Sequence, residues 1–257
     1  MEQNKKRILA SILIFALTFS VLAFSGCVEE NENIVTIGTS ADFPPFEYLD
    51  DDGNIIGFDI DMTKAILEDL GYTVEVKDIT FDSLIPSLQT GKIDVIAAAM
   101  TITDKREEQV DFTEPYYEAD QSVLVINSST IELNNTIDLQ NYTVGSQTGS
   151  TGAAWVEEHL VYNGTMDDQN FSRYDTYTLA VLDLINGNID AVVLDKPVAE
   201  AFMENKDVKI IKTIITGESY GLAVQSGDTT LLEELNDGLA TLMDSEEWTT
   251  LIETYFE

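Results

Sequence analysis

The chain carries one short phrase twice, and this internal repeat constrains the fold more than any other feature of the sequence. Residues 91–97 read GKIDVIA and residues 187–193 read GNIDAVV. A second pair of similar phrases, at 35–40 and 142–147, occurs in the same order. Apolar, β-branched runs that follow apolar helical stretches are typical of buried parallel strands. The repeat therefore predicts an α/β protein with two lobes of like architecture.

Residues 1–26 have the pattern of an export signal. A basic segment at 5–7 precedes an apolar segment at 8–24, and small residues then lead to Cys27, the only cysteine of the chain. This pattern indicates a lipoprotein signal peptide, after which Cys27 becomes the lipidated first residue and 27–33 form a short acidic tether. A retained membrane anchor and an ordinary cleaved signal peptide are the alternatives. All three place the folded part outside the cytoplasmic membrane.

The composition excludes several classes of function. The chain has 47 acidic and 13 basic residues, a formal net charge of −34, which excludes nucleic acid as a partner. We interpret this acidity as a solubility feature rather than as a field for a cationic substrate. With Cys27 assigned to the anchor, no disulfide is predicted. His159 is the only histidine and is expected to be solvated, so no metal site, cofactor or Ser-His-Asp triad is predicted.

The residues after the first copy of the repeat predict an anion site. The run 93–98 is expected to form a buried strand, and Thr103 is a suitable N-cap for a helix that has Arg106 in its first turn. A helix start already carries partial positive charge, so an arginine there is expected to face an anion. A local ion pair with Glu107 or Glu108 is the alternative.

The second copy of the repeat supplies an opposite charge. When the two copies are superposed, Ala99 corresponds to Asp195, and both are predicted at the carboxyl ends of parallel strands, where open α/β sheets bind ligands. The Gly-rich loop 146–152 also offers backbone N–H groups to an anion. It lacks the lysine of a nucleotide-binding loop, which makes phosphate the weaker alternative. Arg106 on one wall and Asp195 on the other fit a zwitterion such as an α-amino acid.

Periodic patterns predict most of the other elements. They indicate strands over 34–38, 72–76 and 121–126, a helix through Met62 and Leu70 that Gly71 closes, a helix through 84–88 that Asp82 caps, and two helices within 231–256 that cover the core.

Several phrases together resemble one known family. They lie at 43–47 (FPPFE), 57–61, 81–88, 101–106 (TITDKR), 111–117, 147–151 and 189–195. The chain is similar in these positions to the extracellular solute-binding proteins of family 3, which deliver amino acids to ABC transporters. The resemblance covers nearly the whole chain after the export signal.

The resemblance implies a fold and its boundaries. It is the type II periplasmic-binding-protein-like fold, in which each of two lobes is a sheet flanked by helices. Lobe 1 is expected over 34–119 and 220–257, and lobe 2 over 120–219. Two crossing segments, near 118–122 and 216–221, are expected to form the hinge.

The resemblance also implies a ligand site. Arg106 is similar to the arginine that binds the ligand α-carboxylate, with help from backbone N–H groups at Thr101 and Thr151. Asp195 is similar to the carboxylate that binds the α-ammonium, with the carbonyl of Ala99 and the Thr101 hydroxyl. The full predicted ligand-binding set is Ser40, Phe43, Phe81, Ala99, Met100, Thr101, Arg106, Thr148, Ser150, Thr151 and Asp195.

Phe43 and Phe81 match positions that sandwich the ligand side chain in that family, and plain core packing is the alternative for both. Basic-amino-acid binders of the family often carry an acid where this chain has Ser40. Asp42 and Glu47 lie near that position. A polar uncharged ligand such as glutamine and a basic ligand reached through Asp42 both stay open.

The resulting functional prediction is a binding protein and not an enzyme. It is expected to be a monomer on the outer face of the cell membrane, with a free amino acid, an ABC transporter permease and, through Cys27, the membrane as partners. A dehydratase on the same scaffold and a ligand-sensing ectodomain are the alternatives.

Acceptor triplets for N-glycosylation cluster in one part of the sequence. They begin at Asn127, Asn134, Asn141, Asn163 and Asn170, all within the predicted lobe 2. The clustering predicts a glycosylated lobe on an exported protein, and turn-forming asparagine is the alternative.

Overall fold

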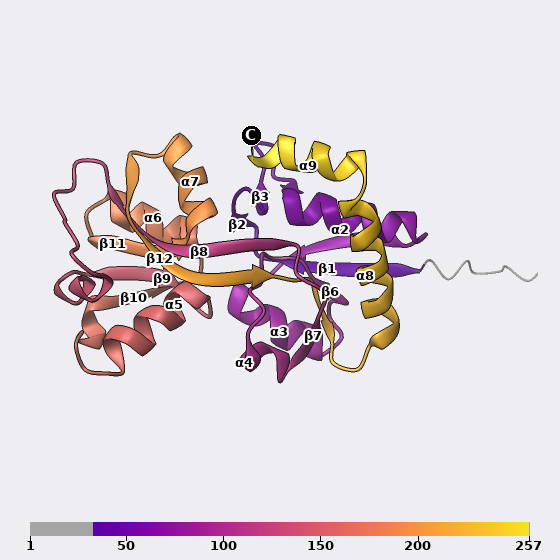
Figure 1. Cartoon of the computed structure of the whole chain (residues 1–257), viewed down its shortest axis with the longest axis horizontal. Coiled ribbons are helices and arrows are strands. Elements are labelled where there is room, and N and C mark those ends of the chain that lie inside the picture. The colour runs from indigo at the N-terminus through magenta and orange to yellow at the C-terminus, as the bar shows by residue number, and fades with distance from the viewer. Residues whose placement is uncertain (1–32, 257) are drawn as a thin grey trace, which may run out of the picture. The chain divides into compact units, whose positions relative to one another are not determined.

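The computed structural model describes residues 33–256, which form two five-stranded sheets and one three-stranded sheet flanked by helices (Figure 1). The sheet of lobe 1 has the order β5-β1-β6-β13-β7, and that of lobe 2 has the order β10-β9-β11-β8-β12. The strands are β1 Ile34–Thr39, β2 Asp42–Phe43, β3 Glu47–Leu49, β4 Ile55–Ile56, β5 Thr73–Asp78, β6 Val95–Ile96, β7 Val110–Phe112, β8 Tyr117–Ile126, β9 Val144–Gln147, β10 Phe171–Tyr174, β11 Ala191–Asp195, β12 Val208–Tyr220 and β13 Ala223–Gln225. The predicted α/β class and two-lobed architecture are confirmed.

The two copies of the repeat occupy equivalent places in the two sheets. β6 pairs in parallel with β1, and β11 pairs in parallel with β9. The strand predicted over 93–98 is shorter than expected, because only Val95 and Ile96 form β6. The chain turns away after β6, where Ala99 has a positive φ of 44°. This turn carries the following residues toward the space between the lobes.

The helices are α2 Phe58–Asp69, α3 Phe81–Gln89, α4 Asp104–Glu107, α5 Thr151–Val156, α6 Tyr177–Ile185, α7 Lys196–Asn205, α8 Thr229–Met243 and α9 Glu246–Phe256. Short 3-10 turns occupy Thr136–Asn141 and Asp168–Asn170, and a π turn occupies Glu157–Val161. Gly71 follows α2 with a φ of 85°, as the predicted helix end requires. The predicted cap of α3 is wrong, because Thr80 is the N-cap and Asp82 lies in the first turn.

Two long strands connect the lobes. β8 and β12 pair in antiparallel fashion from Val208 opposite Ile126 to Tyr220 opposite Tyr117. The ladder is interrupted between Ile214 and Glu218, where Gly217 has a φ of 62°. Figure 1 shows the two strands side by side along their length. They include the predicted hinge segment 118–122 and all of 216–221 except Gly221, which follows β12. The exact lobe boundaries stay predictions.

The two C-terminal helices cover the core of lobe 1, as predicted. The leucines at 231, 235, 239 and 242 are buried on α8. On α9, Trp248 and Phe256 pack edge-on against Phe58, with ring centroids 5.3 and 5.1 Å away. Since Phe58 begins α2, these contacts join the end of the chain to its first helix after β4.

The predictions for the export signal, Cys27 and the tether up to residue 32 lie outside the described residues. Within residues 33–256, no helix is both long and apolar enough to cross a membrane. Of the five acceptor asparagines, Asn127, Asn134, Asn141 and Asn163 are exposed, and Asn170 is half-buried.

Candidate functional site

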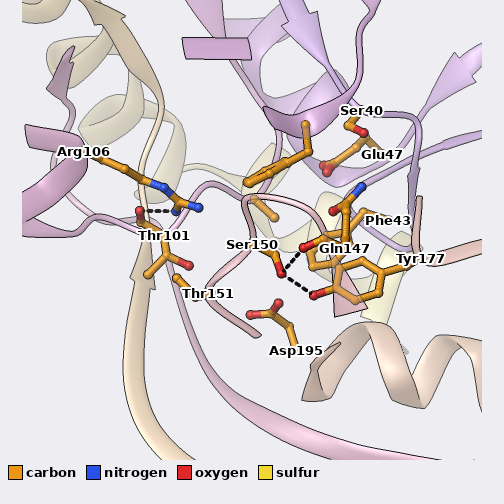
Figure 2. Close-up of a pocket in the computed structure, with 12 residues that line it drawn as sticks. Ser40, Phe43, Glu47, Thr101, Arg106, Gln147, Ser150, Thr151, Tyr177 and Asp195 are labelled. Carbon is orange, nitrogen blue, oxygen red and sulfur yellow. Dashed lines mark hydrogen bonds between the residues drawn. The ribbon is translucent and has the colours of Figure 1, made fainter. Parts of the chain in front are cut away.

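One cavity lies between the two lobes and brings most of the predicted site residues together (Figure 2). It contains about 300 Å³ of space not filled by atoms, part of it open to solvent. Its lining is Ser40, Phe43, Glu47, Phe81, Ala99, Thr101 and Arg106 from lobe 1, with Gln147, Ser150, Thr151, Tyr177 and Asp195 from lobe 2. Arg106 and Asp195, far apart in the sequence, are both buried in this lining. A ligand that contacts both side chains would therefore lie enclosed between the two lobes.

Arg106 lies in the short helix α4, whose N-cap is Thr103 as predicted. Its guanidinium donates to the carbonyl of Thr101 at 2.6 Å and, across the cleft, to the carbonyl of Gly149 at 3.1 Å. It also lies over the ring of Phe81, 5.3 Å from the centroid. Burial lowers the pKa of Arg106, which is only 8% exposed. The alternative of a local ion pair is wrong, because none of the ion pairs within residues 33–256 includes Arg106.

Asp195 ends β11 and faces the cavity from lobe 2. Its Oδ1 accepts from the Tyr220 hydroxyl and from Nε2 of Gln121, both at 2.9 Å. Burial, and then the nearby charge of Glu218, raise the pKa of Asp195 to about 7. A cation beside this carboxylate would favour its ionised form.

The buried carboxylate of Asp59, in the first turn of α2, holds the turn at Ala99. Oδ2 of Asp59 accepts from the backbone N–H of Ala99 at 2.7 Å and from the Tyr116 hydroxyl at 2.5 Å. A positive φ is unfavourable for a residue with a Cβ, so the turn depends on such contacts. Burial raises the pKa of Asp59 to about 7. Asp59 lies in the phrase 57–61, one of those that carried the family resemblance, but the sequence gave no sign of this supporting role.

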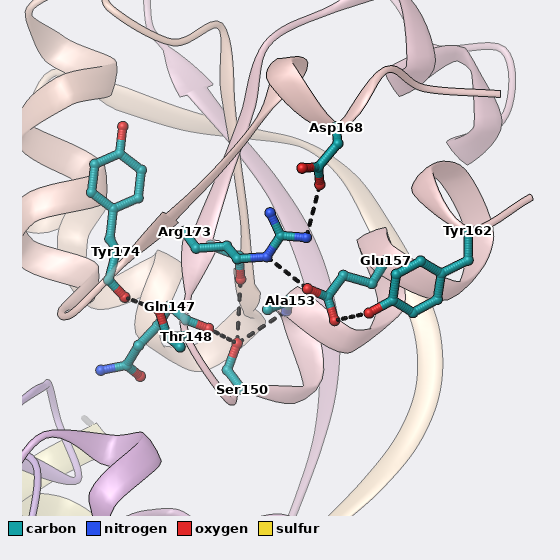
Figure 3. A network of polar contacts seen from close by, with 10 residues as sticks. Gln147, Thr148, Ser150, Ala153, Glu157, Tyr162, Asp168, Arg173 and Tyr174 are labelled. Carbon is teal, nitrogen blue, oxygen red and sulfur yellow. Dashed lines mark hydrogen bonds and ion pairs between the residues drawn. The ribbon is translucent and has the colours of Figure 1, made fainter. Parts of the chain in front are cut away.

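The loop before α5 is held by lobe 2 itself (Figure 3). Ser150 caps α5, accepting from the N–H of Ala153 at 3.0 Å. Both the backbone N–H and the hydroxyl of Thr148 donate to the carbonyl of Tyr174, at 2.8 and 3.1 Å. Behind the loop, Arg173 forms ion pairs with Glu157 at 2.7 Å and Asp168 at 3.0 Å.

Two members of the predicted set do not line the cavity. The Thr148 hydroxyl is turned toward β10, and the Met100 side chain packs in a buried apolar cluster with 1% exposure. Three lining residues were absent from the predicted set, namely Glu47, Gln147 and Tyr177. Glu47 and Gln147 belong to phrases that carried the family resemblance, which was a usable signal. Tyr177 had no local signal.

Two acids of the three-stranded sheet, Asp42 on β2 and Glu47 on β3, have opposite surroundings. Asp42 accepts from the Ser40 hydroxyl at 2.9 Å and, across the cleft, from Nε2 of Gln147 at 3.3 Å and the backbone N–H of Tyr177 at 2.5 Å. Glu47 is 1% exposed, and neither carboxylate oxygen has a hydrogen-bond partner among the described residues. Burial, and then the charges of neighbouring aspartates, raise the pKa of Glu47 well above its ordinary value.

The described chain offers no metal site. Among residues 33–256, no group of three or more His, Cys, Asp or Glu side chains is arranged to hold a metal ion. His159 is exposed and stacks on Trp155, with ring centroids 4.8 Å apart. It is not among the residues that line the cavity with Arg106 and Asp195, but it lines a second, more open pocket that also contacts both lobes.

Comparison with known proteins finds relatives that match nearly the whole described chain in sequence and in fold. A probable histidine-binding protein of Neisseria gonorrhoeae is 32% identical over 255 residues, covering 94% of this chain and 93% of the relative. An ancestral arginine-binding protein bound to arginine superposes with a TM-score of 0.82 at 38% identity, covering 88% of this chain and 99% of the other. An ancestral arginine-binding protein bound to glutamine gives 0.80 at 40% identity, covering 87% and 98%. The model of bacterial extracellular solute-binding proteins, family 3, matches residues 35–257, and the chain belongs to that family.

Proposed function

We propose that this chain captures a basic α-amino acid between its lobes and delivers it to an ABC transporter. One observation carries the choice of ligand. Glu47 lines the cavity as a buried carboxylate whose two oxygens have no partner among the described residues. Such a group is costly unless a donor reaches it, and a cationic side chain of the ligand would supply both a donor and a charge.

The end of the cavity that holds Arg106 and Asp195 fits the part that all amino acids share. Arginine presents a planar fork that matches a carboxylate, and an aspartate accepts from an ammonium group. Both side chains are buried, so an α-carboxylate and an α-ammonium would pair with them in a water-poor site. We assign the α-carboxylate to Arg106 and the α-ammonium to Asp195.

Asp42 does not serve as the acid for a basic side chain in this proposal. Its oxygens already accept from Ser40, Gln147 and Tyr177. Relatives named for histidine and arginine support the basic class. Glutamine is the second candidate, because its amide can also donate to Glu47 and one similar structure holds glutamine.

We further propose that the protein binds its ligand without converting it. A dehydratase on this scaffold would need an acid or base placed to move protons at the ligand. In the proposed complex Asp195 is engaged by the α-ammonium and Glu47 by the ligand side chain. The one histidine is exposed and outside the cavity lining.

The family is extracytoplasmic. Within that setting we propose that residues 1–26 are removed, that Cys27 is lipidated and anchors a monomer to the membrane, and that a permease receives the ligand. We also propose glycans on the acceptor asparagines of lobe 2. Intact-mass analysis of native protein tests both modifications. A mass equal to that of the bare chain would contradict them.

Thermal-shift and calorimetric titration with L-arginine, L-lysine, L-histidine and L-glutamine test the proposed ligand class. A basic amino acid is expected to bind most tightly, with one ligand for each chain. Chromatography of the ligand after prolonged incubation is expected to return it unchanged. Preference for glutamine over all three basic amino acids would overturn the basic class, and turnover would overturn the binding role.

A further inference from the structure

Glu218 joins the two lobes at the cavity, although it is not among the lining residues. It lies on β12, immediately after the interruption in the ladder with β8. Its Oε2 accepts from the hydroxyl of Thr101 at 2.8 Å and from the hydroxyl of Thr151 at 2.7 Å. Thr101 belongs to lobe 1 and Thr151 begins α5 of lobe 2, and both line the cavity. One hinge carboxylate therefore contacts a cavity hydroxyl from each lobe.

Backbone contacts fix the position of this carboxylate. Asp120 Oδ1 accepts from the N–H groups of residues 216 and 217, at 2.9 and 3.0 Å, just before Glu218. On the other side, the N–H of Ile102 donates to the carbonyl of Ser219 at 2.8 Å. The segment that carries Thr101 is thus hydrogen-bonded directly to the hinge strand.

A glutamine links Glu218 to the ammonium site. Nε2 of Gln121 lies 3.1 Å from Oε1 of Glu218 and 2.9 Å from Oδ1 of Asp195. It also lies 3.2 Å from the hydroxyl of Thr151. The acid of the hinge and the acid of the cavity therefore share one donor.

The contacts of Glu218 decide what the two hydroxyls offer to a ligand. A threonine hydroxyl has one hydrogen to donate and two lone pairs that accept, whereas a carboxylate only accepts. Both hydroxyl hydrogens point at Glu218, so each hydroxyl presents only accepting lone pairs elsewhere. An ammonium group has three hydrogens to donate. Asp195 and two accepting hydroxyls fit such a group, whereas a carboxylate would be repelled.

We propose that Glu218 is a positioning residue for recognition of the α-ammonium. It holds the Thr101 and Thr151 hydroxyls as acceptors, and because each hydroxyl comes from a different lobe, the acceptor set is complete only when the lobes meet. The inference rests on the proposed function, since it takes an amino acid as the occupant of the cavity. Without the carboxylate, the hydroxyls rotate freely and the preference for a ligand that carries an amine falls.

Calorimetry of the wild-type chain and of Glu218→Gln, each with two ligands, tests the proposal. The ligands are L-arginine and 5-guanidinopentanoic acid, which is arginine without its α-amino group. Both hydroxyls donate to the same oxygen, Oε2, so an amide nitrogen in its place would donate to them and free their hydrogens, and they would no longer present only accepting lone pairs. The opposite orientation of the amide would place its nitrogen against Nε2 of Gln121, donor against donor. The variant should bind L-arginine at least tenfold more weakly but the analogue within threefold of wild type. Equal losses for both ligands, or an unchanged affinity for L-arginine, would overturn the proposal.

Two controls separate this role from a general structural one. Glu233→Gln, an exposed site on α8, is expected to match wild type with both ligands. In a Thr101→Val, Thr151→Val background, Glu218→Gln is expected to cause no further loss for L-arginine, because its effect passes through those hydroxyls. A further tenfold loss in that background would contradict the mechanism. This comparison does not require the Glu218→Gln single variant to be stable.

Failure of the proposed function would already be visible in titrations of the wild-type chain, before any variant is measured. If the wild-type chain prefers L-glutamine, the same cycle uses L-glutamine and glutaramic acid, its analogue without the amine, with the same expected outcomes. If the wild type binds none of the amino acids, both the proposed function and the role of Glu218 are refuted before any variant is compared.

Discussion

The two ends of the cavity differ in how their charged groups are satisfied. At one end Arg106 and Asp195 each have two hydrogen bonds to protein groups, and the threonine hydroxyls are held by Glu218. At the other end Glu47 has no partner among the described residues. A group with protein partners keeps one orientation before the ligand arrives, whereas a buried acid without partners depends on the ligand. The first end is therefore suited to the α-carboxylate and α-ammonium that all amino acids share, and the second to the side chain that distinguishes one amino acid from another.

Loss of Arg106 is expected to have the largest effect and to abolish recognition at the shared end. Arg106→Ala would leave the ligand α-carboxylate buried without its cation, at a cost of about 3 to 5 kcal/mol, or a hundredfold to several thousandfold in affinity. Calorimetry with L-arginine and L-glutamine should show the loss for both ligands. A variant that keeps near wild-type affinity while remaining folded by circular dichroism would refute the assignment.

A change at Glu47 is expected to affect one ligand class only. Glu47→Gln keeps the shape but removes the charge that a basic side chain would meet. A hydrogen bond to a charged group contributes roughly 1.5 to 3 kcal/mol, so L-arginine should bind about ten- to a hundredfold more weakly. L-Glutamine should bind within about threefold of wild type, as measured in the same titrations. Equal losses for both ligands would remove the distinction between the two ends.

The pH dependence of affinity follows from the acids at both ends. The pKa of Asp195 is about 7 before a ligand binds, and an α-ammonium beside it would lower that value. Binding below pH 7 must then release a proton, so affinity for L-arginine should rise from pH 6 toward pH 8 and level off, by at most tenfold per pH unit for this group. The pKa of Glu47 is also raised, so a cationic side chain that binds beside it would release a further proton and strengthen the same pH dependence. Calorimetry in buffers of different ionisation enthalpy measures how many protons are released when the ligand binds. Glu47→Gln should release fewer protons than wild type.

The smallest effect is expected at Asp42, which belongs to neither end. Its contacts to Gln147 and to the first turn of α6 cross the cleft, so it stabilises contact between the lobes rather than a ligand group. Asp42→Asn should weaken L-arginine and L-glutamine alike, by about two- to tenfold, since one cross-cleft hydrogen bond is worth about 1 kcal/mol. The ratio of the two affinities should not change. A loss confined to L-arginine would instead make Asp42 a ligand group.

The sequence predicted the strands and helices of the two lobes better than it predicted the contacts within the site. The repeated phrases at 91–97 and 187–193 identified the two strands that lead to Ala99 and Asp195, because burial and strand propensity are local properties of a phrase. The cap at Thr103 was likewise a local pattern and is confirmed. The end of the strand at Ile96 was missed because a tertiary contact, from Asp59 to Ala99, sets the turn.

Local sequence patterns could not identify the groups that distinguish the two ends of the cavity. Asp42 and Tyr177 are 135 positions apart, and Thr101 and Glu218 are 117 positions apart. Asp42 and Glu47 looked equivalent in the sequence, as two acids in one loop. Only the arrangement of both lobes separates them, because two of the partners that satisfy Asp42, Gln147 and Tyr177, come from lobe 2.

The pairing of β8 with β12 limits how the lobes move when a ligand enters. Sliding one strand along the other would break the ladder and reverse the faces of its side chains, since side chains alternate along a strand. Bending needs no such exchange, and it is easiest where the ladder is interrupted between Ile214 and Glu218. A bend there would open and close the cleft while the rest of the ladder stays paired. Closure by such a bend would bring the two threonines back to the same carboxylate, so the strand pairing itself would guide the ligand contacts into register.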